Sequence, residues 1–126
     1  MKKILYICSR FILGVLLVVA GVAHFMNPEF YLKAMPDYIP FHEFIVYASG
    51  VIEILLGILL VISKTSRQAA FAIIALFVAV FPANVNMYLN HEEFADMSET
   101  SLLIRLPIQL VLIAWAYIYT RKNYEV

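Results

Sequence analysis

The residue with the clearest chemical potential is Glu53, in the segment Ser-Gly-Val-Ile-Glu-Ile-Leu-Leu-Gly at positions 49–57. It stands near the centre of an apolar run from Phe44 to Ile62. That run is close to the roughly 20 apolar residues that cross a bilayer. An ionised side chain at such a depth costs on the order of 2.5–3.5 kcal/mol on insertion scales, so it normally faces a partner or a cavity. Glu53 is therefore taken as the centre of a candidate site.

Polar side chains also interrupt the other apolar runs, and with Glu53 they form the predicted ligand-binding set: His24, Asn84, Asn86, Arg105 and Gln109. A quinone, or a similar small apolar molecule with polar carbonyls, requires a hydrophobic slot and a few hydrogen-bond donors. The imidazole, the amides and the guanidinium would supply those donors. Glu53 would act as a proton acceptor, or as a carboxylate that Arg105 keeps ionised.

A purely structural use of these groups is also open, and a metal site is considered beside it. In a purely structural network, Arg105 would pair with Glu53 and the amides would complete the hydrogen bonds; such a buried pair is poor evidence of stabilisation. A metal site needs several converging His, Asp, Glu or Cys ligands, and Glu53 with His24 falls short of that number, so no metal is predicted. No nucleophile with a base and an orienting group is visible, and catalytic residues stay unassigned.

The composition indicates an integral membrane protein. The chain has 126 residues, of which 63% are hydrophobic and only 14% charged, and its mean hydropathy is +0.86. A soluble domain is typically about 45–50% apolar and about 25% charged. The net charge of zero leaves no basic patch for nucleic acid. One cysteine, Cys8, excludes an internal disulfide. The length predicts one domain over residues 1–126.

Four apolar runs, at about 4–25, 44–62, 69–89 and 102–120, predict four spanning helices and an all-α fold. The first run resembles a signal peptide, but its length and Arg10 argue for a retained helix. Its helical spacing places Gly14 and Gly21 on one stripe with His24, where glycines allow a neighbouring helix to approach closely. Arg10 is expected to extend to the nearer membrane interface.

The segment between the first two runs predicts a short helix at the membrane interface. Asn27 suits the N-cap and Pro28 the first helical position, and Pro36 stops the helix. Aromatic side chains of this segment are expected in the interfacial aromatic belt: Phe30, Tyr31, Tyr38 and Phe41.

Small residues and prolines shape the later runs. Gly50 and Gly57 flank Glu53 on a face with little side-chain bulk, which a neighbouring helix could approach and which is also expected to leave room for a ligand. Pro82 predicts a kink that frees the carbonyl of Val78. Pro107 is expected to bend or to start the fourth helix. A stripe of small residues on the third run predicts a helix-contact surface: Ala72, Ala75, Ala79, Ala83 and Asn86.

The distribution of charge predicts the orientation. The basic residues at one side of a four-span topology are Lys2, Lys3, Lys64, Arg67, Arg121 and Lys122. The other two loops hold Lys33 as their only Lys or Arg before Arg105, and six acidic residues before Glu99. The positive-inside rule then places both termini in the cytoplasm. With a rise of about 1.5 Å per residue, Glu53 lies about 13 Å below the external end of its helix. The six polar residues fall in the external half, and Arg10 alone lies at the other face.

Four short stretches, in order, resemble the DoxX-like family of small four-helix bacterial membrane proteins: 21–28 (GVAHFMNP), 49–53 (SGVIE) with Gly57, 81–84 (FPAN) and 105–109 (RLPIQ). They cover the chain from about Phe11 to Arg121. The resemblance implies an antiparallel four-helix bundle in the bacterial cytoplasmic (inner) membrane. It also implies a role as an accessory subunit of a quinone-linked oxidoreductase, as some relatives are described. No intrinsic cofactor is expected, and a bound quinone or a partner subunit would carry any electrons.

Three functions are compatible with these features. The first is a redox-associated subunit that binds a small lipophilic ligand in an external pocket. The second is a small transporter, although the cytoplasmic half offers only Arg10 and apolar packing, which favours a blind pocket. The third is an assembly factor whose Ala75 and Ala79 face docks a larger complex. The lipid bilayer, a redox partner subunit and a second copy of the chain are the expected partners; nucleic acid is not.

Overall fold

The computed structural model of this chain describes residues 2–90, 92 and 98–121. Its helices are α1 (Lys2–Met26), α2 (Pro28–Ala34), α3 (His42–Val61), α4 (Ser66–Leu89) and α5 (Glu99–Ile118). The expected all-α class, with a short helix between the first two long ones, is confirmed.

Four helices, α1, α3, α4 and α5, are long and apolar enough to cross a membrane, which fits a multi-pass membrane protein. Their ends differ from the expected ones by at most three residues. The start of α5 is fixed by Ser98, whose Oγ accepts a hydrogen bond of 3.0 Å from the backbone N–H of Ser101. Pro107 therefore lies inside α5 and does not start it.

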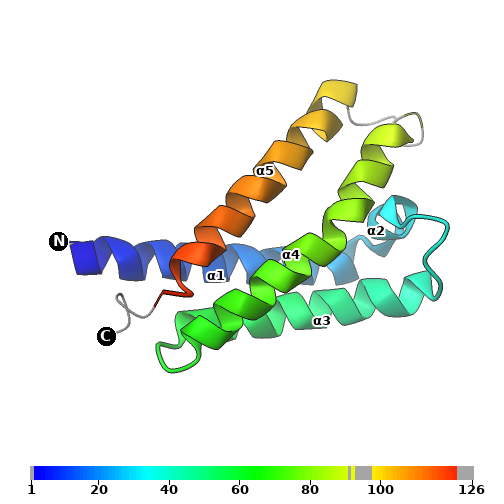
Figure 1. Ribbon diagram of the computed structural model, residues 1–126. Coiled ribbons are helices and arrows are strands. Elements are labelled where there is room, and N and C mark those ends of the chain that lie inside the picture. The colour runs from blue at the N-terminus through cyan, green and yellow to red at the C-terminus, as the bar shows by residue number, and fades with distance from the viewer. Residues whose placement is uncertain (1, 91, 93–97, 122–126) are drawn as a thin grey trace.

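The long helices form two antiparallel pairs, α1 with α3 and α4 with α5, and α3 packs on α4 next to the short link between them. Figure 1 shows that the pairs cross obliquely. They meet where α1 and α4 begin and α3 and α5 end, which we call the termini end. They diverge toward the opposite end, called the α2 end, where α2 lies. The bundle is thus a wedge with α2 at its wide side.

Glycines bring α1 and α3 into backbone contact. A Cβ added at Gly14 would lie 2.7 Å from the carbonyl oxygen of Gly57, and one added at Gly21 would lie 2.6 Å from that of Gly50. The close approach expected from the glycines of the first run is therefore present. A neighbouring helix also approaches the face of Gly50 and Gly57, as expected, and that helix, α1, occupies the space that was expected to hold a ligand.

A buried apolar cluster fills the termini end and includes Leu13, Leu60 and Ile73, none of which is exposed. Within it, Tyr119 of α5 packs edge-on against Tyr6 of α1, with ring centroids 5.2 Å apart. This cluster ties the two helix pairs together where they converge.

Polar groups at the termini end are hydrogen-bonded to one another. The Trp115 indole N–H donates to Ser9 Oγ at 2.8 Å and to the Tyr119 hydroxyl at 2.9 Å. Ser9 and Tyr119 also share a hydrogen bond between their hydroxyls. Arg67 Nε donates to the carbonyl of Thr120 at 2.9 Å. The expectation that this half holds only Arg10 and apolar packing is therefore wrong.

Arg10 reaches toward the end of α3. Its side chain is buried, with 6% of the residue exposed, and its extension to a membrane interface stays a prediction. One guanidinium nitrogen donates to the carbonyl of Val61 at 3.4 Å, and the group lies 5.7 Å from the ring centre of Tyr6. Val61 is the last residue of α3. A cation at a helix C-terminus meets the negative end of the helix dipole, which explains why Arg10 turns inward.

Helix α2 is anchored to its neighbours through the backbone. Asn86 Nδ2 of α4 donates to the carbonyl of Ala34 at 3.1 Å, and His42 Nε2 lies 3.0 Å from the carbonyl oxygen of Pro36. Asn27 occupies the N-cap position, but its side chain makes no capping hydrogen bond. Pro28 stands at the start of α2, as expected.

The aromatic residues of this region divide into two groups. Tyr38 and Phe41 are 77% and 79% exposed, in keeping with the aromatic belt. Phe30 and Tyr31, on α2, are half-buried, and each contacts a polar side chain of a neighbouring long helix. The exposed Tyr38 and Phe41 thus fit the aromatic belt, whereas Phe30 and Tyr31 pack against the bundle.

Candidate functional site

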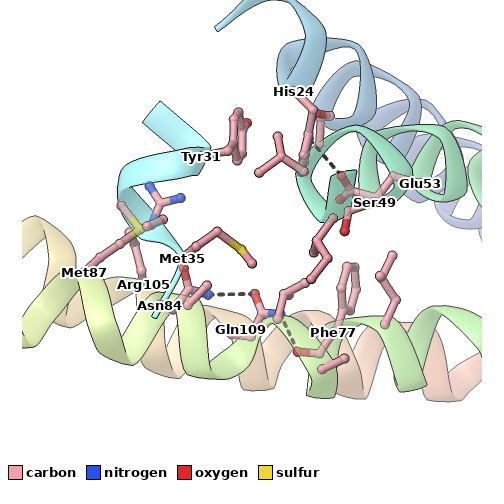
Figure 2. A pocket seen from close by; sticks show the side chains of 18 of the residues that line it. His24, Tyr31, Met35, Ser49, Glu53, Phe77, Asn84, Met87, Arg105 and Gln109 are labelled. Atoms are coloured by element: carbon pink, nitrogen blue, oxygen red, sulfur yellow. Dashed lines mark hydrogen bonds and ion pairs between the residues drawn. The ribbon is translucent and has the colours of Figure 1, made fainter. Parts of the chain in front are cut away.

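A cavity of about 560 Å³ occupies the wide side of the wedge, between the two helix pairs and against α2. All five helices contribute to its wall, and apolar side chains form most of it. The polar side chains around it are His24, Tyr31, Ser49, Glu53, Asn84, Arg105 and Gln109. Figure 2 shows how these residues lie around the space. Five of the six predicted site residues are among them.

His24 and Glu53 form the contact between α1 and α3 at this cavity. His24 Nδ1 lies 3.2 Å from Glu53 Oε2 and 2.9 Å from the carbonyl oxygen of Ala20. Of these two contacts, the one with the Ala20 carbonyl is a hydrogen bond, in which Nδ1–H donates. Glu53 Oε2 is buried and has no hydrogen-bond partner among the described residues; its 3.2 Å contact with His24 is a close approach and not a hydrogen bond. Because Glu53 also lines the cavity, Oε1 is the oxygen left to meet a ligand.

Tyr31 of α2 covers the imidazole. The two rings are stacked, with centroids 3.9 Å apart and planes 15° from parallel. Burial raises the pKa of Tyr31, the negative charge of Glu53 raises it further, and Arg105 lowers it. The phenol is therefore neutral well above neutral pH and lies within electrostatic range of both charged residues.

Arg105 of α5 enters the cavity from the opposite side (Figure 2). Its guanidinium carbon lies 5.8 Å from the ring centre of Phe30, on α2, a cation–π distance. No described acidic residue lies within 4.0 Å of the guanidinium, so the expected pairing of Arg105 with Glu53 is wrong. Glu53 contacts His24 instead, because α3 packs along α1 while α5 diverges from both.

Gln109 and Asn84 join α5 to α4. Gln109 Nε2 donates to the carbonyl of Phe77 at 2.9 Å, and its Oε1 accepts a long hydrogen bond of 3.4 Å from Asn84 Nδ2. Pro82 cannot donate to the preceding turn, which frees the carbonyl of Val78 beside that of Phe77. Gln109 thus supports α4 next to its proline, and part of its hydrogen-bonding capacity is used within the protein.

Asn86 does not line the cavity. Its Nδ2 holds the end of α2, as described above, and its Oδ1 accepts a hydrogen bond of 2.9 Å from Asn90. Residues 84 and 86 are two apart on a helix and so point in different directions. Asn86 therefore positions α2 above the cavity from outside.

A comparison with protein-family models matches residues 13–120 to a domain of unknown function, DUF8561. The chain belongs to this DUF8561 family. No curated protein matches the sequence, and no solved structure matches the fold. The comparisons give no assignment to the DoxX-like family that the sequence resembles.

The structure of this DUF8561 member places further residues at the cavity. Ser49 stands one helical turn before Glu53, a spacing that puts both on one face of α3. Met35 and Tyr31 come from α2 and its end. Ser49 was visible from the helical period, whereas the two α2 residues depended on how that helix packs.

The alanine stripe of α4 points partly outward. Ala72 and Ala75 are exposed and lie outside the cavity, Ala79 lines the cavity, and Ala83 packs against a small buried cluster around Met87. Of the predicted helix-contact surface, the part that packs inside the bundle is therefore the part near the α2 end, at Ala83.

Within the described residues there is no group of three or more His, Cys, Asp or Glu side chains that would hold a metal ion.

Proposed function

We propose that this protein binds a small lipophilic molecule with a polar, carbonyl-bearing head, of the quinone class, in the cavity at the α2 end. The carrying observation is the composition of that cavity. Its wall is mostly apolar, and a few polar side chains from separate helices converge on it. A volume of about 560 Å³ lies within the roughly 300–1,000 Å³ of small-molecule sites.

Each polar side chain has a distinct use in this proposal. Arg105, which no described carboxylate neutralises, would donate to a carbonyl oxygen of the head. Glu53 Oε1 would accept a proton or a hydrogen bond, with His24 holding the carboxylate in place. Tyr31 and Phe30 would pack against the ring system of the ligand.

A redox role would follow from the ligand. The resemblance to DoxX-like proteins supports an accessory subunit of a quinone-linked oxidoreductase, with the electrons carried by the quinone and a partner subunit. The bacterial inner membrane, with both termini cytoplasmic, completes this proposal. A reporter fused after the last residue tests the orientation, since an enzyme active only in the cytoplasm should be active there.

Extraction of the purified protein tests the binding itself. We expect a quinone-class molecule to co-purify with the wild type at near-stoichiometric amounts. Glu53→Gln and Arg105→Ala should lower its amount at least tenfold. Glu43→Gln, which changes an exposed carboxylate on the same helix α3, serves as the control and should retain the ligand. Unchanged retention in both cavity variants would remove the site assignment.

A second candidate function, docking of a larger membrane complex, is favoured by the exposed Ala72 and Ala75, which lie outside the cavity. Small side chains allow another helix to approach the backbone closely. Under this function, Ala75→Leu would abolish association with a partner, and Glu53→Gln would leave it intact. Co-purification of both variants from native membranes separates the two functions. A transporter is less well supported, because the packed apolar cluster closes the termini end.

A further inference from the structure

The two ionisable residues at opposite sides of the cavity, Glu53 and Arg105, differ in their partners. Glu53 has His24 at 3.2 Å, but Arg105 has only the face of Phe30, and no described acidic side chain lies within 4.0 Å of it. Figure 2 shows Arg105 and Glu53 at opposite sides of the space. An arginine without a counter-ion is costly at membrane depth, and such residues normally pair or face a cavity that supplies a partner.

The shape of the cavity is also uneven along the bundle. The polar residues lie toward the α2 end, while Leu16 of α1, Leu76 of α4 and Leu112 of α5 line it farther toward the termini end. Leu16 is eight residues from His24, which is about 12 Å along the helix axis. The cavity therefore has a polar section beside α2 and an apolar section that reaches into the bundle.

We infer that the ligand binds as an anion: an acidic amphiphile whose ionised oxygen contacts Arg105 and whose hydrocarbon part fills the section lined by Leu16, Leu76 and Leu112. This inference rests on the proposed function and specifies the chemistry of the same ligand. A negative oxygen at Arg105 supplies the counter-charge that the described residues do not provide. Its distance from Glu53, across the cavity, keeps the two negative groups apart.

Two sources carry this chemistry: a quinone ring with an acidic hydroxyl group, and a fatty acid. Both have an ionised oxygen beside an apolar body. The two ligands differ in their contacts within the polar section of the cavity. A ring with a second carbonyl would also reach Glu53 Oε1 or His24, whereas a fatty acid would contact Arg105 alone. Matched pairs of probes therefore test the charge and the source separately.

The experiment measures equilibrium binding to the full chain in lipid nanodiscs. The first pair is an alkylated 2-hydroxy-1,4-naphthoquinone and its O-methyl ether, which differ in the acidic hydroxyl. The second pair is palmitic acid and hexadecanol. We expect the acidic member of at least one pair to bind at least tenfold more tightly than its neutral partner. The pair that shows this preference identifies the source.

Variants link the preference to Arg105. Arg105→Gln should abolish the difference between the acidic and neutral members, and Arg105→Lys should retain part of it, because the charge remains. Lys64→Gln, which removes an exposed positive charge outside the cavity, should leave the preference unchanged. If Arg105→Gln does not fold, the comparison of acidic and neutral probes on the wild type decides the inference alone.

The outcomes separate this inference from the proposed function. Equal binding of the hydroxyquinone and its ether, with no preference for palmitic acid, would overturn the anionic ligand and leave quinone binding standing. A preference for the acid that persists in Arg105→Gln would also overturn it, because another group would then hold the anion. Absence of binding for all four probes and for a neutral quinone would overturn both.

Discussion

The two ends of the bundle both bury polar side chains, but they satisfy them in different ways. At the termini end, Ser9, Trp115 and Tyr119 hydrogen-bond to one another inside a packed apolar cluster. At the α2 end, Glu53 and Arg105 face a cavity of about 560 Å³ and do not pair with each other. Polar residues within the candidate spanning helices are thus common to both ends, and at the α2 end they line the cavity described above.

The geometry of the helix pairs explains this difference. The α1–α3 and α4–α5 pairs converge at the termini end, so side chains from α1 and α5 reach one another there. The pairs diverge at the α2 end, and α2 spans the opening without filling it. A polar residue in a membrane helix therefore indicates a binding site only where the surrounding helices leave a volume beside it.

The largest predicted effect is on the packing that holds the α1–α3 pair together. A Cβ at Gly57 would meet the carbonyl oxygen of Gly14, and α1 cannot yield without breaking the contact. Gly57→Leu should lower the free energy of unfolding by about 3 kcal/mol or more. Unfolding in mixed detergent micelles measures it. The control is Ala72→Leu, on an exposed position of α4, which should cost little.

The second predicted effect concerns the cavity at the α2 end. Val80 of α4 lines the cavity, and Val80→Phe would place a ring in the space proposed for the ligand. Ligand retention should fall at least tenfold, which corresponds to about 1.4 kcal/mol of binding free energy. Stability should hardly change, because the ring fills an existing volume. Val78→Phe, at a position 56% exposed on the same helix, should bind normally. A large loss of stability in Val80→Phe would show that the cavity is packed in the membrane.

The third predicted effect concerns the hydrogen bonds at the termini end. Tyr119→Phe removes a hydroxyl that bonds to both Ser9 and Trp115, and should cost about 1 kcal/mol of unfolding free energy. Trp115 is the single tryptophan of the chain, so its fluorescence reports the local change directly. Tyr117→Phe, at an exposed position of α5, is the matched control. If the emission spectrum and the unfolding free energy were both unaltered, these hydrogen bonds would contribute nothing to the stability of the termini end.

The smallest effect is expected at Asn84. Its hydrogen bond to Gln109 is long, at 3.4 Å, and bonds between membrane helices average about 0.6 kcal/mol. Asn84→Ala should therefore change the unfolding free energy by that amount or less. Gln109→Leu should cost more, because it also removes the 2.9 Å hydrogen bond to the Phe77 carbonyl. The reverse order of the two variants would contradict the assignment of Gln109 as the main link between α4 and α5.

Much of the fold was predictable from the sequence because apolar length and glycine position act locally. Runs of about 20 apolar residues specify spanning helices, and the short link 63–68 joins antiparallel neighbours. Gly14 and Gly21 indicated a close helix contact, which the structure has with α3. The orientation of the bundle in the membrane rests on the basic residues alone and stays a prediction.

The sequence predicted which residues line the cavity better than it predicted which of them contact one another. Five of the six chosen residues line one cavity, because they lie at similar heights on their helices. Which of them touch depends on the tilt between helix pairs, and so Glu53 meets His24 and not Arg105. Tyr31 was assigned to the interface, since no periodic pattern in a seven-residue helix shows which way it faces.

The sequence alone thus determined the number of candidate spanning helices, their approximate ends and the height of each polar group along its helix, because these follow from residue order and a fixed rise per residue. Only the tertiary structure decided that Arg10 turns inward to the end of α3, that Asn86 lies outside the cavity, and that Arg105 stands apart from Glu53. Those outcomes depend on the crossing angle of two helix pairs. That angle arises from packing among residues distant in the chain.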